Sequence, residues 1–123
     1  MEAVVTCGIS GLGTPGLSVS TTRTFTGGLT YDFAVAGTTA NQLLTTAWTA
    51  ADADAIFISS DITLTIKTNS SGSPAETITI TEDVPFFWQR DSGITNPFAT
   101  NVTALYISPA GAVAGTLKIR VVT

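Results

Sequence analysis

Two short segments of the chain alternate apolar residues with threonine almost one for one. They are residues 62–68, Ile-Thr-Leu-Thr-Ile-Lys-Thr, and residues 76–81, Glu-Thr-Ile-Thr-Ile-Thr, with the turn-forming sequence Asn-Ser-Ser-Gly-Ser-Pro between them. Successive side chains of a β-strand point to opposite faces of a sheet, so this pattern turns isoleucine and leucine toward a core and threonine outward. The two segments therefore predict a β-hairpin with one buried face and one hydroxyl-rich face.

Further strand-like segments recur about every ten residues, with glycine or proline turns between them and no long helical pattern. They are residues 17–25, 29–35, 55–59, 85–90, 103–107 and 116–122, and residues 40–48 are ambiguous between irregular structure and a strand. Residues 17–25 are expected to pair with 29–35 across Gly27-Gly28, and residues 103–107 with 116–122. We therefore predict an all-β, single-domain, eight-stranded β-sandwich of jelly-roll type. An immunoglobulin-like sandwich is the alternative, because the pattern does not reveal strand order.

The start of the chain differs in composition from the rest. Residues 8–16 are dominated by glycine and other turn formers, and they follow the apolar start Ala-Val-Val at residues 3–5. We expect residues 1–16 to form an extended N-terminal arm and residues 17–123 to form the sandwich. Such an arm could add a strand to a neighbouring subunit's sheet, although an ordinary first strand of the same domain fits equally well.

The charge content limits the classes of partner. Only 11% of the residues are charged, the formal net charge is -4, and five lysine and arginine residues are the only cations. A chain without a basic patch is not expected to bind nucleic acid. The sequence has no long apolar run, so we expect neither a membrane helix nor a secretory signal. Its single cysteine, Cys7, is consistent with folding in a reducing cytoplasm. Low charge favours assembly with other protein surfaces.

Few residues could carry catalysis. The chain has no histidine, and adjacent acids such as Glu82 and Asp83 do not face each other as a catalytic pair would. The densest oxygen cluster matches no calcium-loop motif, so solvated turn carboxylates are favoured over a metal site; it comprises Asp52, Asp54, Asp61, Ser59 and Ser60. We predict a non-enzymatic protein with no catalytic residues, no cofactor and no metal.

The aromatic residues offer two interpretations. Trp48, Trp88 and Tyr106 could stack on a sugar ring, but burial in the core is the simpler expectation. Phe86 and Phe87 are consecutive, so one ring should enter the core while the other needs a covering neighbour. The predicted interface set joins this pair to the arm and the threonine faces: Val4, Val5, Thr63, Thr65, Thr77, Thr79, Phe86 and Phe87.

Several sequence runs resemble small virion proteins of tailed bacteriophages. They are Ala-Ile-Phe-Ile-Ser-Ser-Asp-Ile-Thr-Leu-Thr-Ile-Lys-Thr-Asn at 55–69, Pro-Ala-Glu-Thr-Ile at 74–78, Pro-Phe-Phe-Trp at 85–88 ahead of Asn-Pro-Phe at 96–98, and Leu-Lys-Ile-Arg-Val at 117–121. The resemblance covers residues 40–123. It implies a capsid decoration or cement protein that is made in the bacterial cytoplasm and located on the virion surface. The implied partner is the major capsid protein, and the implied oligomer is a homotrimer. A head-fibre, collar or tail component and a carbohydrate- or receptor-binding module are the alternatives.

Overall fold

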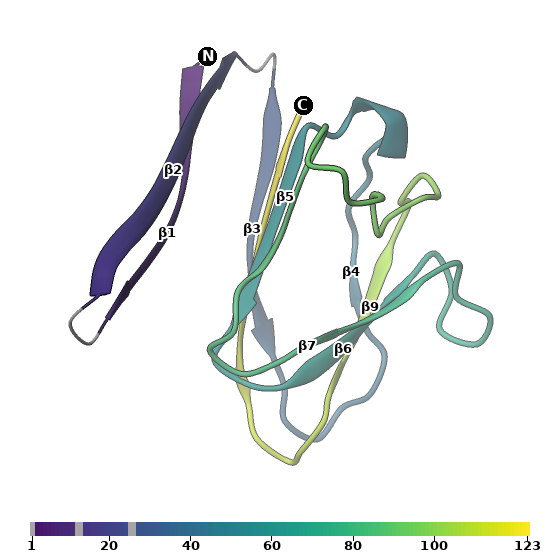
Figure 1. Ribbon diagram of the computed structural model, residues 1–123. Helices are drawn as coiled ribbons and strands as arrows, with labels where there is room; N and C mark the ends of the chain where they lie inside the picture. Colours follow the sequence, from purple (N-terminus) through teal and green to yellow (C-terminus); the bar gives the residue numbers. More distant parts are fainter. Residues whose placement is uncertain (1, 12–13, 25–26) are drawn as a thin grey trace.

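A computed structural model describes residues 2–11, 14–24 and 27–123, with side chains from residue 27 onward. A two-stranded N-terminal hairpin precedes two four-stranded antiparallel sheets that face each other (Figure 1). The strands are β1 (Glu2–Gly11), β2 (Thr14–Thr24), β3 (Gly28–Val35), β4 (Gln42–Leu44), β5 (Ala55–Ser60), β6 (Leu64–Thr68), β7 (Thr77–Ile80), β8 (Phe86–Gln89), β9 (Leu105–Pro109) and β10 (Gly115–Val122). Among the described residues the one helical segment is the short 3-10 turn Ala50–Asp52, and no helix could span a membrane.

The strand order of the sandwich confirms the predicted jelly roll. One sheet runs β3-β10-β5-β8 and the other β4-β9-β6-β7. The pairs nest: β6 pairs with β7, β5 with β8, β4 with β9, and β3 with β10. The chain therefore folds as one long antiparallel ribbon whose successive strand pairs alternate between the two sheets, which is the jelly-roll arrangement.

The core lies between the two inner faces, and residues at every second position of each strand supply it. In β6 and β10 the buried positions alternate with outward ones, as the sequence pattern predicts. The fully buried set includes Ile56, Ile58, Leu64, Ile66, Ile80, Leu105, Ile107, Leu117 and Ile119. Because the alternation has a period of two, a shift of one residue in any of these pairings would expose an isoleucine or leucine, and this fixes the register.

The hairpin predicted from residues 62–81 is confirmed as β6 and β7. Ile66 lies opposite Ile78, and Thr65 lies opposite Thr79. Asn69 begins the connecting turn with a φ of 65°, a left-handed conformation that asparagine tolerates better than most residues. The ambiguous segment 40–48 contains the short strand β4 and an isolated bridge between Trp48 and Val102.

Two of the predicted strand pairings are wrong. Strand β3 pairs with β10 and not with residues 17–25, because the inward residues Leu117 and Ile119 of β10 complete the core beside β3. Strands β9 and β10 do not pair with each other but lie in different sheets, and the segment between them crosses from one sheet to the other (Figure 1). In both cases the true partner is far away in the sequence, so a local turn signal pointed to the wrong strand.

The N-terminal segment also differs from the extended arm that we expected. Strand β1 pairs with β2 from Glu2 opposite Thr24 to Gly11 opposite Thr14, with one irregularity between Ile9 and Gly11. The expected boundary between residues 16 and 17 therefore falls inside β2 of this N-terminal hairpin, and the sandwich itself begins with β3. Met1, residues 12–13 and residues 25–26 lie outside the described part of the chain.

Candidate interaction surfaces

The outer face of sheet β4-β9-β6-β7 is covered largely by hydroxyl groups, and we call it the hydroxyl face. It comprises Thr63, Thr65, Thr77, Thr79, Tyr106 and Ser108, together with Lys67 and with the exposed Leu43 of β4, which lies opposite Tyr106. Thr65 lies between Thr79 and Ser108 in the register of the three neighbouring strands. Thr77 and Thr79 are exposed, whereas the Thr63 hydroxyl accepts a hydrogen bond of 3.1 Å from the Glu82 backbone N–H. The four predicted threonines therefore do share one face.

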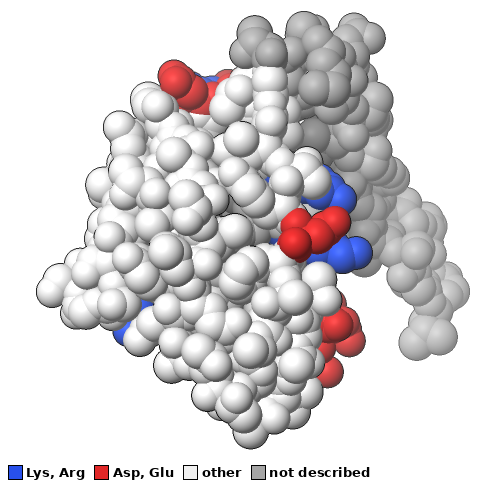
Figure 2. All heavy atoms as spheres, turned by 180° about the vertical axis from the view of Figure 1, so that it is seen from behind, with Lys and Arg blue, Asp and Glu red and all other residues white. Residues whose placement is uncertain are grey.

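Charge is nearly absent from the hydroxyl face. Lys67 is the one charged residue in the four strands of this sheet, and its Nζ donates a 2.9 Å hydrogen bond to the Ser71 carbonyl oxygen. Figure 2 shows the same tendency on the side of the molecule opposite to Figure 1, where charged groups gather at the margins of a broad uncharged area. A neutral face of hydroxyl groups costs less to desolvate than a charged one, provided that a covering partner satisfies its hydrogen bonds.

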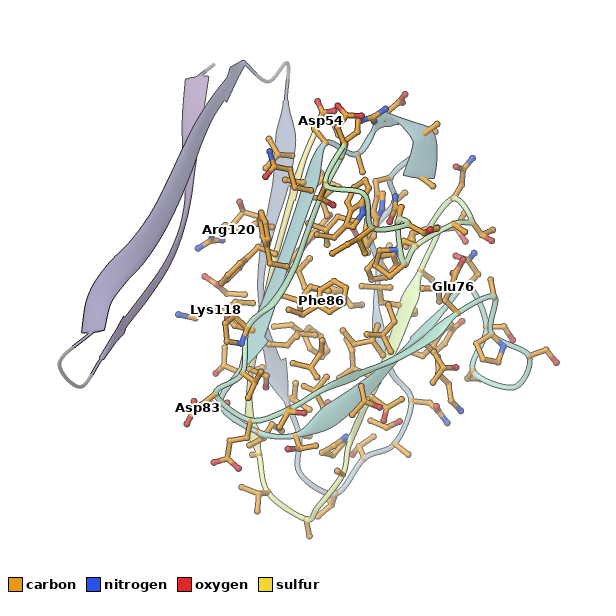
Figure 3. All side chains as sticks on the ribbon, in the orientation of Figure 1. Asp54, Glu76, Asp83, Phe86, Lys118 and Arg120 are labelled. Atoms are coloured by element: carbon orange, nitrogen blue, oxygen red, sulfur yellow. The ribbon has the colours of Figure 1, made fainter. Side chains whose placement is uncertain are left out.

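The outer face of sheet β3-β10-β5-β8 carries two exposed aromatic side chains. Phe57 on β5 lies directly opposite Phe87 on β8, and the two residues are 39% and 42% exposed. Arg120 on β10 lies opposite Phe57 on its other side, and Figure 3 shows Lys118 and Arg120 extending outward from this sheet. We call Phe57 and Phe87 with these two basic neighbours the aromatic face.

The prediction for the consecutive phenylalanines is confirmed and can now be made specific. The Phe86 ring lies between the sheets (Figure 3) and meets the buried Phe98 edge-on, with 6.4 Å between ring centroids. Phe87 is the outward residue, so of this pair only Phe87 lies on the outer face of the sheet. Phe57 was missed, because the run Ile56-Phe57-Ile58 looks uniformly apolar. Strict alternation within this run would have placed Phe57 on the outer face.

The predicted arm residues Val4 and Val5 lie on β1. Val4 is opposite Thr22 and Val5 is opposite Thr21 in the N-terminal hairpin. Their side chains lie outside the described part of the structure. Because they are adjacent in a strand, they occupy opposite faces of the hairpin, so one surface cannot contact both.

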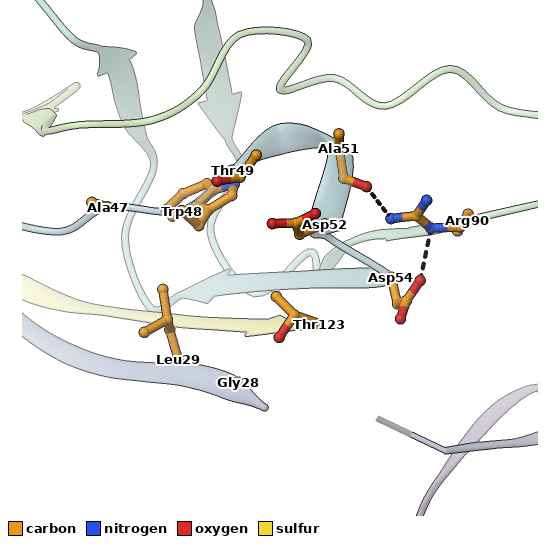
Figure 4. Close-up of a pocket in the computed structure, with 10 residues that line it drawn as sticks. All are labelled: Gly28, Leu29, Ala47, Trp48, Thr49, Ala51, Asp52, Asp54, Arg90 and Thr123. Atoms are coloured by element: carbon orange, nitrogen blue, oxygen red, sulfur yellow. Dashed lines mark hydrogen bonds and ion pairs between the residues drawn. The ribbon is translucent and has the colours of Figure 1, made fainter. Parts of the chain in front are cut away.

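One end of the sandwich carries a hollow of about 570 Å³, lined by ten residues that include Trp48, Asp52, Asp54 and Arg90 (Figure 4). Arg90 closes one side of it through a 2.7 Å ion pair between its Nε and Oδ1 of Asp54. Its Nη2 donates to the carbonyl oxygens of Ala51 and Ala53 at 2.5 and 2.7 Å. These contacts tie the 3-10 turn to the end of β8. Arg90 and Asp54 therefore act together as a structural clamp.

The aspartates grouped in the sequence are separated by the fold. Asp54 precedes β5 and Asp61 follows it, so they lie at opposite ends of this strand. The carboxylate of Asp61 accepts a 2.7 Å hydrogen bond from the Thr116 N–H. Among residues 27–123 and the other described positions, no three acidic, cysteine or histidine residues come together as a metal site would require.

The two tryptophans are buried and form no exposed stacking platform. Both are 7% exposed, and the Trp88 Nε1 donates a 2.8 Å hydrogen bond to the Ile94 carbonyl oxygen. Trp48 packs edge-on against Phe98, with 5.3 Å between ring centroids. Of the three aromatics considered for a sugar, only Tyr106 lies partly exposed, on the hydroxyl face.

Glu76 anchors the long loop that covers this end of the core. Its carboxylate accepts hydrogen bonds from the Thr68 hydroxyl and from the Thr100 N–H, the latter at 2.8 Å. Partial burial acts to raise the pKa of Glu76, but the hydrogen bonds from Thr68, Thr100 and Ala99 together outweigh it and hold the pKa below its ordinary value of 4.5. The ionised form is therefore the one that this loop stabilises.

We expect Glu76→Gln to reduce the loss of stability in acid. Because the folded state lowers the pKa of Glu76, its contribution is present above the unfolded pKa and is lost as the pH falls through the folded pKa. The measurement is urea unfolding at about pH 6 and about pH 3, where the difference between the two pH values should be smaller for the variant than for the wild type. Glu82→Gln, at an exposed turn position, is the control and should leave the difference unchanged. An equal acid loss in Glu76→Gln and wild type would contradict the assignment.

Comparison with known proteins adds no relative. No family model, no curated protein and no solved structure matches this chain.

Proposed function

We propose that this chain is a non-enzymatic structural protein of a tailed-bacteriophage virion, a capsid decoration protein that binds the outside of the shell through the hydroxyl face. Its partner is the major capsid protein, and it stabilises the shell by bridging capsid subunits. It is made in the host cytoplasm and resides on the capsid surface. Binding only to the assembled shell stabilises that state by mass action.

The observation that carries the proposal is the neutrality of the hydroxyl face. Four strands present one charged side chain, Lys67, and Lys67 is already hydrogen-bonded to Ser71. The cores of protein interfaces are depleted of charge, because a buried unpaired charge costs more than the contact returns. Hydroxyl groups can donate and accept, so a row such as Thr79, Thr65 and Ser108 can satisfy hydrogen bonds from a partner's backbone.

The resemblance of residues 40–123 to phage virion proteins supplies the class of partner, and the buried tryptophans weigh against the carbohydrate-binding alternative. Trp48 and Trp88 would have to leave the core to stack on a sugar. A head-fibre, collar or tail component would use the same kind of face, so the location in the virion is tested together with the function.

The test is co-sedimentation of the purified protein with empty shells assembled from the major capsid protein encoded in the same genome. We expect the wild type to pellet with shells and Thr79→Lys to bind at least about tenfold more weakly, since the variant buries an unpaired charge on the hydroxyl face. Thr38→Lys is the matched control, because it adds the same charge at an exposed turn position outside this face.

Two outcomes would overturn the proposal. If the wild type stays in the supernatant at every concentration, the protein is not a shell-binding protein, and isolated tails and collars become the next probes. If Thr79→Lys binds shells as tightly as the wild type, or if Thr38→Lys weakens binding as much as Thr79→Lys does, the hydroxyl face is not the contact surface.

A further inference from the structure

The register of the N-terminal hairpin gathers most of its apolar residues on one face. This face carries Ala3, Val5, Cys7 and Ile9 of β1 with Val19 and Leu17 of β2, and it also carries Thr21 and, at the end next to Ala3, Arg23. The opposite face carries mainly small polar residues: Thr6, Ser18, Ser20, Thr22 and Thr24. A two-stranded hairpin alone is marginally stable in water, so an amphipathic one needs a surface to cover its apolar face.

The aromatic face is the complementary surface. Phe57 and Phe87 are direct cross-strand neighbours, and each ring is more than a third exposed. Two adjacent exposed rings form a contiguous apolar patch, and such patches mark interaction sites more often than scattered single residues do. Two outward residues near the rings are small. Thr30 of β3 lies opposite Arg120, and Ser59 lies two residues after Phe57 on β5. A second sheet layer could therefore pack on this part of the face.

The hairpin that covers the two rings could come from the same chain or from another copy. The length of the segment between β2 and β3 bears on this choice. β2 ends at Thr24 and β3 begins at Gly28, and these four peptide steps reach at most about 14 Å. Phe57 and Phe87 lie two and three strands away from β3, which is about 10 to 14 Å across the sheet, and a covering layer stands about 10 Å above it. A chain's own hairpin would therefore reach both rings only with this connection almost fully extended, and in Figure 1 the hairpin stands apart from the sandwich.

We propose that the N-terminal hairpin of one copy packs its apolar face on the aromatic face of a second copy, over Phe57 and Phe87. Each copy gives one hairpin and receives one, so the contact is complete in a two-fold exchanged dimer or in a closed head-to-tail ring, of which a trimer is a small example. This interface leaves the hydroxyl face of every copy uncovered. It forms without a capsid, so it can fail or succeed independently of the proposed function.

The test is the mass of the full chain in solution by light scattering across a concentration series. We expect the wild type to form a discrete oligomer, and Phe87→Lys to need at least about tenfold higher concentration to form it. Leu43→Lys is the matched control, because Leu43 is also a large exposed apolar residue but lies on the other sheet. Thermal melting checks that both variants fold.

The hairpin side of the contact has its own matched pair. Val5→Asp lies on the apolar face and should weaken the oligomer, whereas Val4→Asp lies on the opposite face and should not. Mixing Phe87→Lys with Val5→Asp gives the sharpest result. The first variant still offers an intact hairpin and the second an intact aromatic face, so the mixture should form a one-to-one dimer although neither forms one alone.

Three results would overturn the inference. A monomeric wild type excludes the contact. An oligomer that Phe87→Lys leaves unchanged places the interface elsewhere. A monomer that Phe87→Lys destabilises means that the chain's own hairpin covers the rings.

Discussion

Phe98→Ala should lower the free energy of unfolding by about 3–5 kcal/mol, the usual cost of truncating a fully buried phenylalanine. Phe98 has no exposed surface, and it packs edge-on against both Trp48 and Phe86. Small domains have about 5–15 kcal/mol of total stability, so a loss of this size removes a large share of it. Urea unfolding of the purified variant measures the change.

The control lies in the same loop. Ile94 is 68% exposed, and its described hydrogen bonds use the backbone: the carbonyl oxygen accepts from Trp88 and the N–H donates to Ser92 Oγ, so Ile94→Ala retains both. We expect that variant to stay within about 0.5 kcal/mol of the wild type. If Phe98→Ala were equally mild, the loop between β8 and β9 would not be part of the core.

Phe98 also illustrates what a sequence pattern cannot reveal. It follows Pro97 in a loop without alternation, so nothing local distinguishes it from a solvated residue. Its burial depends on distant contacts: Asn69 holds the Thr103 N–H at 2.8 Å, and Glu76 holds the Thr100 N–H at the same distance. Long-range polar contacts of this kind fold the loop over the open end of the sandwich, and no period-two or helical pattern records them.

The hairpin β6–β7 was predictable for the opposite reason. Its strands are close in sequence, their turn residues are explicit, and the alternation of isoleucine with threonine assigns each residue to a face. The same logic correctly separated Phe86 from Phe87. The strand partners of β3 and β9 were not predictable, because the nested pairing of a jelly roll joins β3 to β10, the two ends of the sandwich. Turn signals report only neighbours in the sequence.

The two candidate surfaces differ in the same way: one rests on a local pattern and the other on a long-range pairing. The hydroxyl face was predictable in its four threonines, since they belong to one local hairpin. The aromatic face required the pairing of β5 with β8, which brings Phe57 beside Phe87 from 30 residues away. The two faces lie on opposite sides of the sandwich, because they are the outer faces of its two sheets. One protein can therefore contact a shell with one face and its own copies with the other.

Gly115→Ala should destabilise the fold by about 3 kcal/mol, the upper end of what one added methyl group costs in a packed site. A Cβ at Gly115 would lie 2.5 Å from Oδ1 of Asp61 and 2.7 Å from two side-chain carbons of Ile62. Neither residue is free to move, since Asp61 holds the Thr116 N–H and Ile62 is buried. This glycine therefore allows β10 to pass close to the turn that joins β5 to β6.

Gly72→Ala is the matched control for the same substitution, because a Cβ there would meet nothing within 4 Å. We expect its unfolding free energy to stay within about 1 kcal/mol of the wild type, with any gain coming from a less flexible unfolded chain. Urea unfolding of both variants makes the comparison. If Gly115→Ala matched Gly72→Ala, the turn at Asp61 would be able to move away from β10. The hydrogen bond from Thr116 would then not be what holds the start of this central strand in place.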